Sequence, residues 1–186
     1  LQMGERPPSG RERLLDLGCG CGDLIEAIRC HYCRKRYEGR QKGCRGRALS
    51  CATDERIPDF DFFGIDCNAE NVQAADEKRG ARIVEGDCGQ LDTLLAGGID
   101  FDVIVCCGLL NRQVTAREDA VHILGQAVSR LRAGGHIVVT GYTACHLAAE
   151  DFSRLGIEVL QRSIPENLFK PYREYHLRQF YVGRKR

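Results

Sequence analysis

The chain has 186 residues, a formal net charge of +1 and a hydrophobic content of 43%. The length suits one compact domain over residues 1–186, and the balanced charge excludes a global field that draws the chain to nucleic acid or a membrane surface. No run of 18 apolar residues is present, so neither a membrane-spanning helix nor a membrane partner is expected. Residues 1–12 are polar and rich in proline and glycine, which predicts a flexible tail.

Apolar runs alternate with helical patterns from residue 13 to residue 163. This alternation predicts a doubly wound α/β fold, because a helix usually carries the chain back between parallel strands. The last two strands have no helix between them, so the final strand is expected to pair antiparallel at one edge. The expected strands are Arg13–Leu17, Phe60–Ile65, Ala81–Glu85, Phe101–Cys106, His136–Thr140, Ile157–Ser163 and Leu177–Val182.

The strongest helical pattern follows Thr115. Thr115 and Glu118 have the spacing of a capping box, and apolar residues recur at helical intervals over 121–131. Gly134 and Gly135 are expected to end this helix. The other expected helices begin at about Asp23, follow Asn68 as an N-cap and run to about Arg79, cover Leu91–Ala96, and lie near Ala144–Leu155.

Eleven cysteines are a high count for this length. Secreted disulfide-rich proteins are typically small and loop-rich, and an odd number of cysteines fits poorly with complete pairing. We therefore expect a cytoplasmic protein whose cysteines are reduced. Six of them are expected at or just beyond strand ends, where they act as small apolar side chains: Cys19, Cys21, Cys67, Cys88, Cys106 and Cys107.

Residues 29–58 interrupt the alternation and hold nine Lys/Arg against three acids, a net charge of +6, so we interpret them as a basic insertion. Such a charge suits a phosphate-rich partner such as RNA, although charge runs more often form a solvated surface. The segment also contains the candidate ligands of a structural zinc ion, Cys30, Cys33, Cys44 and Cys51. The first pair has the spacing of a zinc knuckle. The second pair is spaced irregularly, so a basic loop with incidental thiols is the alternative.

A glycine pattern follows the first expected strand, with Asp16, Gly18, Gly20 and Gly22 in the order Asp-x-Gly-x-Gly-x-Gly. Glycine allows a tight turn and a close approach of the backbone to a ligand, and ligands of doubly wound sheets bind beyond the carboxyl ends of the strands. A dinucleotide-binding loop would need a glycine where Asp23 stands. Because an acid there would repel a pyrophosphate, the loop favours a nucleoside ligand without phosphates over NAD.

Two further acids follow strands. Asp66 comes directly after the second expected strand, and Asp87 comes after the third. A carboxylate at the first position can accept hydrogen bonds from both ribose hydroxyls, and one at the second can accept a hydrogen bond from the exocyclic amine of adenine. The glycine loop and the two acids, in this order, predict a site for an adenine nucleoside.

Five stretches of residues 13–142 resemble the class I S-adenosylmethionine-dependent methyltransferases: LLDLGCGCGDL, FFGIDCNAENVQAA, IVEGDCGQL, FDVIVCCGLL and LRAGGHIVVTGY. The resemblance implies a Rossmann-like, three-layer α/β/α fold of seven strands in order 3-2-1-4-5-7-6, with strand 7 antiparallel. It also implies that S-adenosylmethionine is the cofactor. The implied cofactor-binding residues are Asp16, Gly18, Cys19, Gly20, Gly22, Asp66, Cys67, Asp87, Cys88, Cys106 and Cys107.

Two departures from the family concern the insertion and the acceptor. Gly18 and Asp66 are separated by 48 positions, which the insertion explains, and few residues precede the first strand, so acceptor contacts must come from elsewhere. The leading hypothesis is a methyltransferase for a small-molecule acceptor. The alternatives are an RNA methyltransferase that uses the basic insertion, and a cofactor-binding partner subunit without activity.

Methyl transfer requires a general base only where the accepting atom must lose a proton. Asn111, Tyr142 and His146 follow the fourth and fifth expected strands and are the candidate catalytic residues. The alternative for Tyr142 and His146 is an ordinary rim or surface position.

Overall fold

The computed structural model describes residues 11–34, 60–77, 81–95, 98–141, 147–163 and 179–186. Seven strands of this described part form one sheet in the order β3-β2-β1-β4-β5-β7-β6. Only β7 is antiparallel to its neighbours, β5 and β6, so the predicted strand order and the antiparallel last strand are confirmed. The strands are β1 (Glu12–Leu17), β2 (Phe60–Asp66), β3 (Ala81–Glu85), β4 (Phe101–Cys107), β5 (Leu131–Gly141), β6 (Ile157–Arg162) and β7 (Gln179–Lys185).

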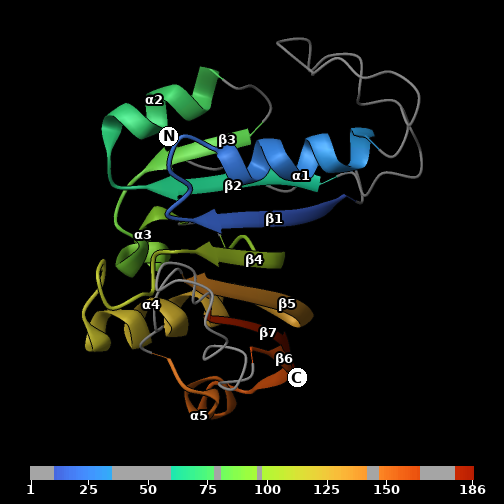
Figure 1. The fold of residues 1–186 in the computed structure, drawn as a ribbon, viewed down its shortest axis with the longest axis vertical. Helices are drawn as coiled ribbons and strands as arrows, with labels where there is room; N and C mark the ends of the chain where they lie inside the picture. The colour runs from blue at the N-terminus through green and yellow to red at the C-terminus, as the bar shows by residue number, and fades with distance from the viewer. Residues whose placement is uncertain (1–10, 35–59, 78–80, 96–97, 142–146, 164–178) are drawn as a thin grey trace, which may run out of the picture.

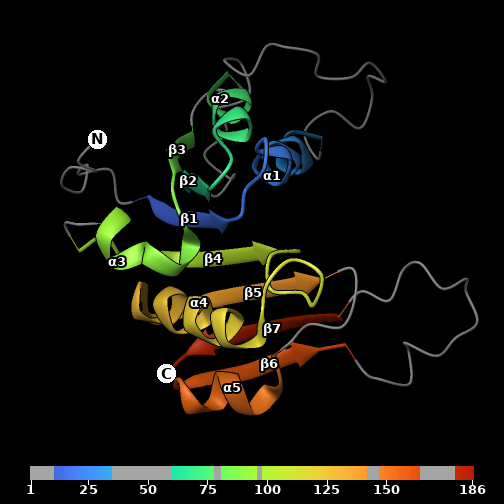
Figure 2. The same ribbon diagram turned by 90° about the vertical axis from the view of Figure 1, so that its left-hand side faces the viewer.

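Helices cover both faces of the sheet, which gives the predicted three layers (Figures 1 and 2). Because successive strand residues point to opposite faces, Leu14 joins the smaller core cluster with Ile25 of α1, whereas Leu15 joins the larger one beneath α3, α4 and α5. Phe63 of β2 and Phe101 of β4 meet edge-on within the larger cluster, with 5.3 Å between ring centroids. The helices are α1 (Asp23–Arg34), α2 (Ala69–Glu77), η2 (Cys88–Gln90), α3 (Leu91–Leu94), α4 (Arg117–Ser129) and α5 (Ala149–Arg154).

The predicted cap of α2 is confirmed, but the capping box of α4 is wrong. Asn68 Oδ1 accepts the Glu70 amide hydrogen at 2.9 Å, as an N-cap should. The N-cap of α4 is instead Ala116, which makes no side-chain cap bond. Thr115 donates its hydroxyl to the Leu109 carbonyl at 2.5 Å, so that hydroxyl closes the preceding loop and is not turned toward the helix.

The end of α4 also differs from the prediction. The helix ends at Ser129, before Gly134 and Gly135, and β5 begins at Leu131. Leu131 pairs with Phe101 at the start of β4, so strand pairing takes over before the glycines are reached. Gly134, with φ of 76°, lies within the register shift of β5.

The first residues of the expected insertion continue a helix. α1 runs through Cys30 and Cys33 to Arg34, whereas residues 35–59, with Cys44 and Cys51, lie outside the described part of the chain. Residues 1–10 of the expected tail also lie outside it, and the tail is shorter than expected because Glu12 already pairs with β2 as the first residue of β1. None of the helices described is both long and apolar enough to cross a membrane.

Candidate functional site

The glycine loop between β1 and α1 is folded over the end of β2. The amides of Gly18 and Cys19 both donate to the Ile65 carbonyl, at 2.8 and 3.0 Å. Gly18, Gly20 and Gly22 have φ of 69°, 53° and 77°, a region that favours glycine because it has no Cβ. The arrowheads of β1, β2 and β4 lie at the same edge of the sheet (Figure 1). The loop therefore stands at the edge where such sheets bind ligands.

Gly18 and Gly20 face different surroundings. A Cβ on Gly18 would lie 3.3 Å from Leu109 Cβ, so the loop packs directly on the segment that follows β4. A Cβ on Gly20 would meet no atom within 4 Å. The backbone at Gly20 is thus open to a ligand, whereas the backbone at Gly18 packs against the Leu109 side chain.

Asp66, at the end of β2, holds both the glycine loop and the start of α2. Its Oδ2 accepts the Gly20 amide hydrogen at 2.8 Å, and its Oδ1 accepts from the Asn68 amide at 3.0 Å and from Asn71 Nδ2 at 3.1 Å. Each carboxylate oxygen has two lone pairs, so Oδ2 retains acceptor capacity for a hydroxyl donor. The ribose role of Asp66 stays a prediction, and the hold of this carboxylate on the glycine loop was not predicted from the sequence.

Asp16, in β1, is the most deeply buried acid described at this edge, with 1% of its surface exposed. Its Oδ1 has no hydrogen-bond partner among the described residues. Burial, and secondarily the negative charge of Asp66, raises the pKa of Asp16 to about 7. A cationic ligand beside such a carboxylate would favour its ionised form and so oppose the effect of both causes on the pKa.

Asp87 follows β3 and caps η2. Its Oδ1 accepts the Gly89 amide hydrogen at 2.8 Å, and the side chain is otherwise exposed. The neighbouring Cys88 is buried, and that burial raises the pKa of its thiol to about 12. The Asp87 carboxylate therefore has capacity to accept from a further donor, whereas the Cys88 side chain packs in the larger core cluster.

The expected packing role of the cysteines is confirmed for some and wrong for others. Cys19, Cys88 and Cys106 are buried. Cys67 and Cys107 are exposed. Cys67 directly follows the last residue of β2, and Cys107 is the last residue of β4. Cys21 is half-buried and donates to Asp23 Oδ2 at 3.5 Å.

No metal site is found within the described ranges, where no three His, Cys, Asp or Glu side chains are placed to hold an ion. Of the candidate zinc ligands, Cys30 and Cys33 are described only as part of α1, and Cys44 and Cys51 lie outside the described residues. Zinc binding stays a prediction, which the metal content of protein prepared without chelator would check.

Gly64 has no Cβ, and the Cys19 side chain packs against its backbone in the space that this leaves. A Cβ on Gly64 would lie 2.7 Å from Ile83 Cδ1 and 2.8 Å from Cys19 Sγ. Gly64→Ala is therefore expected to lower the free energy of unfolding by about 1–3 kcal/mol through overpacking, measured by urea unfolding. The control is Gly125→Ala in α4, where an added Cβ meets nothing within 4 Å. That variant should be as stable as the wild type or slightly more so. Equal stability of Gly64→Ala and the wild type would contradict the packing role.

The candidate catalytic residue Asn111 holds its own loop together. Its side chain is 4% exposed, its Nδ2 donates to the Gly108 carbonyl at 2.5 Å, and its Oδ1 accepts the Gln113 amide hydrogen at 2.9 Å. Both ends of the amide are thus engaged in shaping the β4–α4 loop. Tyr142 and His146 lie outside the described residues, so their catalytic role stays a prediction.

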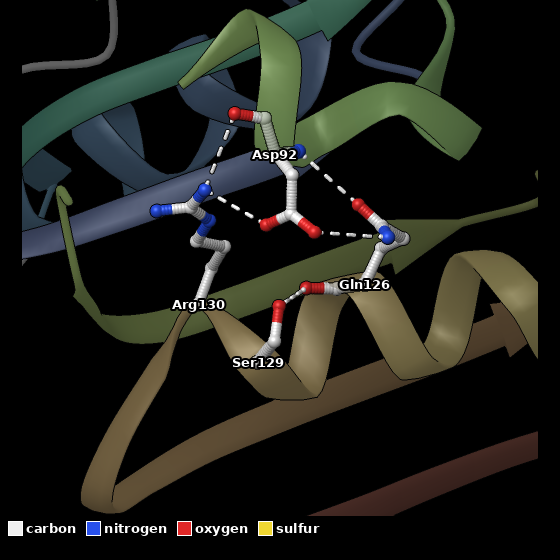
Figure 3. A network of polar contacts seen from close by, with 4 residues as sticks. All are labelled: Asp92, Gln126, Ser129 and Arg130. Atoms are coloured by element: carbon white, nitrogen blue, oxygen red, sulfur yellow. Dashed lines mark hydrogen bonds and ion pairs between the residues drawn. The ribbon is translucent and has the colours of Figure 1, made fainter. Parts of the chain in front are cut away.

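Contacts from α4 to the segment after β3 were not predicted from the sequence. His122 Nε2 lies 2.9 Å from the Gly89 carbonyl. Asp92 of α3 binds Gln126 and Arg130 near the end of α4 (Figure 3). These partners are 33 to 38 positions apart, so no local sequence pattern relates them.

Comparisons with known proteins agree with this geometry. No family model and no curated protein sequence matches the chain, but solved structures do. A TehB-like S-adenosylmethionine-dependent methyltransferase from Corynebacterium glutamicum matches 96% of this chain and 83% of its own, with a TM-score of 0.61 and 20% identity. The chain has the class I methyltransferase fold.

Other solved structures with the class I methyltransferase fold carry different names. Magnesium protoporphyrin IX methyltransferase from Synechocystis, with bound S-adenosylmethionine, matches 95% of this chain and 71% of its own, with a TM-score of 0.58 and 14% identity. The [4+2]-cyclase SpnF matches 96% of this chain and 76% of its own, with a TM-score of 0.60 and 13% identity. Because proteins with different reactions share this fold, the fold alone does not determine the reaction.

Proposed function

We propose that the protein is an S-adenosylmethionine-dependent methyltransferase for a small-molecule acceptor. The observation that carries the proposal is Asp16, a carboxylate buried to 1% exposure with an unpartnered oxygen, beside the loop whose backbone is open at Gly20. S-adenosylmethionine carries an ammonium, a sulfonium and one carboxylate, with no phosphate, so its net positive charge complements Asp16. A pyrophosphate would instead meet Asp16, Asp66 and Asp23.

The remaining residues fit the other parts of this cofactor. Asp66, at the end of β2, would accept from one ribose hydroxyl through the lone pair left on Oδ2. Asp87 has an exposed carboxylate that would accept from the adenine amine, with the Cys88 backbone beside it. Cys106 and Cys107 are the last two residues of β4, next to β1 and its glycine loop. They would border the side of the cofactor that carries the methyl group.

When bound, the cofactor supplies a methyl group activated by its positive sulfur. The protein contributes orientation and exclusion of water. Asn111 and Thr115 hold the β4–α4 loop through the carbonyls of Gly108 and Leu109, which keeps that loop fixed against the glycine loop. A general base, where the acceptor needs one, is assigned to Tyr142 or His146 as a prediction.

Calorimetry with S-adenosylhomocysteine tests cofactor binding. We expect micromolar binding by the wild type and at least tenfold weaker binding by Asp66→Ala, because charged hydrogen bonds contribute about 1.5–3 kcal/mol each. Asp61→Ala, at the opposite end of β2, is the matched control and should bind like the wild type. Absence of micromolar binding, or unchanged binding by Asp66→Ala, would overturn the proposal.

An RNA methyltransferase is the second candidate, favoured by the net charge of +6 over residues 29–58. Transfer of a labelled methyl group from S-adenosylmethionine to total RNA separates the two. The small-molecule proposal predicts no label in RNA and label in a small-molecule extract. A cofactor-binding subunit without activity would label neither.

A further inference from the structure

The segment after β3, residues 87–94, is attached to α4 at two points. At the near point, His122 Nε2 lies 2.9 Å from the Gly89 carbonyl oxygen. A carbonyl oxygen only accepts hydrogen bonds, so Nε2 carries the proton and donates. At the far point, Asp92 is held by Gln126 and Arg130 (Figure 3). Both attachments therefore hold the segment that carries Asp87, the proposed partner of the adenine amine.

The far attachment works as a clamp with several bonds. The Asp92 amide donates to Gln126 Oε1 at 3.1 Å, and Gln126 Nε2 donates back to Asp92 Oδ2 at 3.2 Å. Arg130 Nη2 donates to Asp92 Oδ1 at 2.8 Å (Figure 3). The C-terminal end of the segment is thus fixed without help from His122, whose own contact falls at the other end, beside Asp87.

His122 is connected to Asp87 through Gly89. The Gly89 carbonyl accepts from His122, and the Gly89 amide donates to Asp87 Oδ1 at 2.8 Å. The space around Gly89 is also shared by these side chains, because a Cβ there would lie 3.3 Å from Asp87 Oδ1 and 3.6 Å from His122 Cδ2. A change in the orientation of Gly89 would therefore move the donor that fixes the Asp87 carboxylate.

We propose that His122 is a positioning residue for recognition of the adenine amine, acting through Gly89 on the Asp87 carboxylate. The inference rests on the proposed cofactor and adds a residue that selects adenine over other bases. The proposed role depends on the hydrogen bond from His122 of α4 to the Gly89 carbonyl after β3. His122 itself is not proposed to touch the cofactor.

The test is calorimetry with two ligands, S-adenosylhomocysteine and S-inosylhomocysteine, in which a carbonyl oxygen replaces the adenine amine. The wild type should prefer the adenine ligand, because Asp87 accepts from the amine and would face the carbonyl. His122→Ala should bind S-adenosylhomocysteine about fivefold to tenfold more weakly, as one lost hydrogen bond predicts, and S-inosylhomocysteine almost unchanged. The preference for adenine should shrink accordingly.

Two further variants separate positioning from folding. His122→Gln keeps an N–H donor of similar reach and should restore much of the preference. Ser129→Ala, on the same helix, removes only a bond to the Gln126 carbonyl and should match the wild type for both ligands. Because the His122 contact is solvent-exposed, the melting temperature of His122→Ala should stay close to that of the wild type.

Three results would overturn the inference. His122→Ala with wild-type binding of both ligands would show that Gly89 needs no support from α4. Equal weakening for both ligands would show a general structural effect without base selection. In both cases the wild type binds S-adenosylhomocysteine and the proposed function stands. A wild type that binds neither ligand would overturn the proposed function, and this inference with it.

Discussion

Asp16→Asn is expected to stabilise the cofactor-free protein at about pH 8 by roughly 2–4 kcal/mol and to weaken binding of S-adenosylhomocysteine by at least a hundredfold. The pKa of Asp16 in the folded protein is about 7 against an ordinary value of 3.8, with burial as the main cause and Asp66 as the second. The folded state thus holds this proton more tightly than the unfolded state. The stability of the wild type should fall as pH rises from about 4 to about 7, because the carboxylate becomes charged while buried.

The substitution removes that penalty, since the amide of asparagine does not ionise. The two proteins should have similar unfolding free energies at about pH 4 and diverge as pH rises, as measured by urea unfolding at several pH values. The same change removes the negative charge proposed to face the ammonium of the cofactor, so affinity is lost as stability is gained. Asp61→Asn, at the start of β2, is the control and should alter neither quantity. A pH-independent stability difference, or wild-type affinity in Asp16→Asn, would contradict the assignment.

Gly20→Ala is expected to weaken cofactor binding at least tenfold in a protein that still folds. The φ of 53° at Gly20 is unfavourable for alanine, which should lower the unfolding free energy by about 1 kcal/mol. An added Cβ meets no protein atom within 4 Å, so it occupies space otherwise open to the ligand. We expect at least tenfold weaker binding of S-adenosylhomocysteine by calorimetry, with a far-ultraviolet circular dichroism spectrum like that of the wild type.

Gly98→Ala is a matched control for this variant. Gly98 also has a positive φ, 69°, and open space at its Cβ position, but it lies between α3 and β4. It should lose a similar amount of stability and keep wild-type affinity. If both variants bind equally well, the open space at Gly20 is not part of the cofactor site.

Much of the fold was predictable because its signals are local. Apolar runs of five to seven residues marked the strands, and the absence of a helix before the last strand predicted its antiparallel pairing, which β7 shows. The Asn68 cap is also local, since an N-cap bonds to amides two or three residues away. The Thr115 capping box was wrong because the loop before α4 brings the Thr115 hydroxyl to the Leu109 carbonyl. The hydroxyl bonds to that carbonyl and not to an amide of the first turn of α4.

The sequence by itself determined where the strands lie along the chain and placed the glycine loop, Asp66 and Asp87 at strand ends, because periodicity and turn residues act over a few positions. The order of the strands within the sheet came only from the resemblance to the methyltransferase family. Only the tertiary structure decided how deeply these side chains are buried and which hydrogen bonds hold them. Burial of Asp16 depends on the surrounding sheet, and the hold of Asp66 on Gly20 crosses 46 positions. The contact between His122 and Gly89 crosses 33 positions. Desolvation and long-range hydrogen bonds exist only once distant segments have packed together, and no local pattern encodes them.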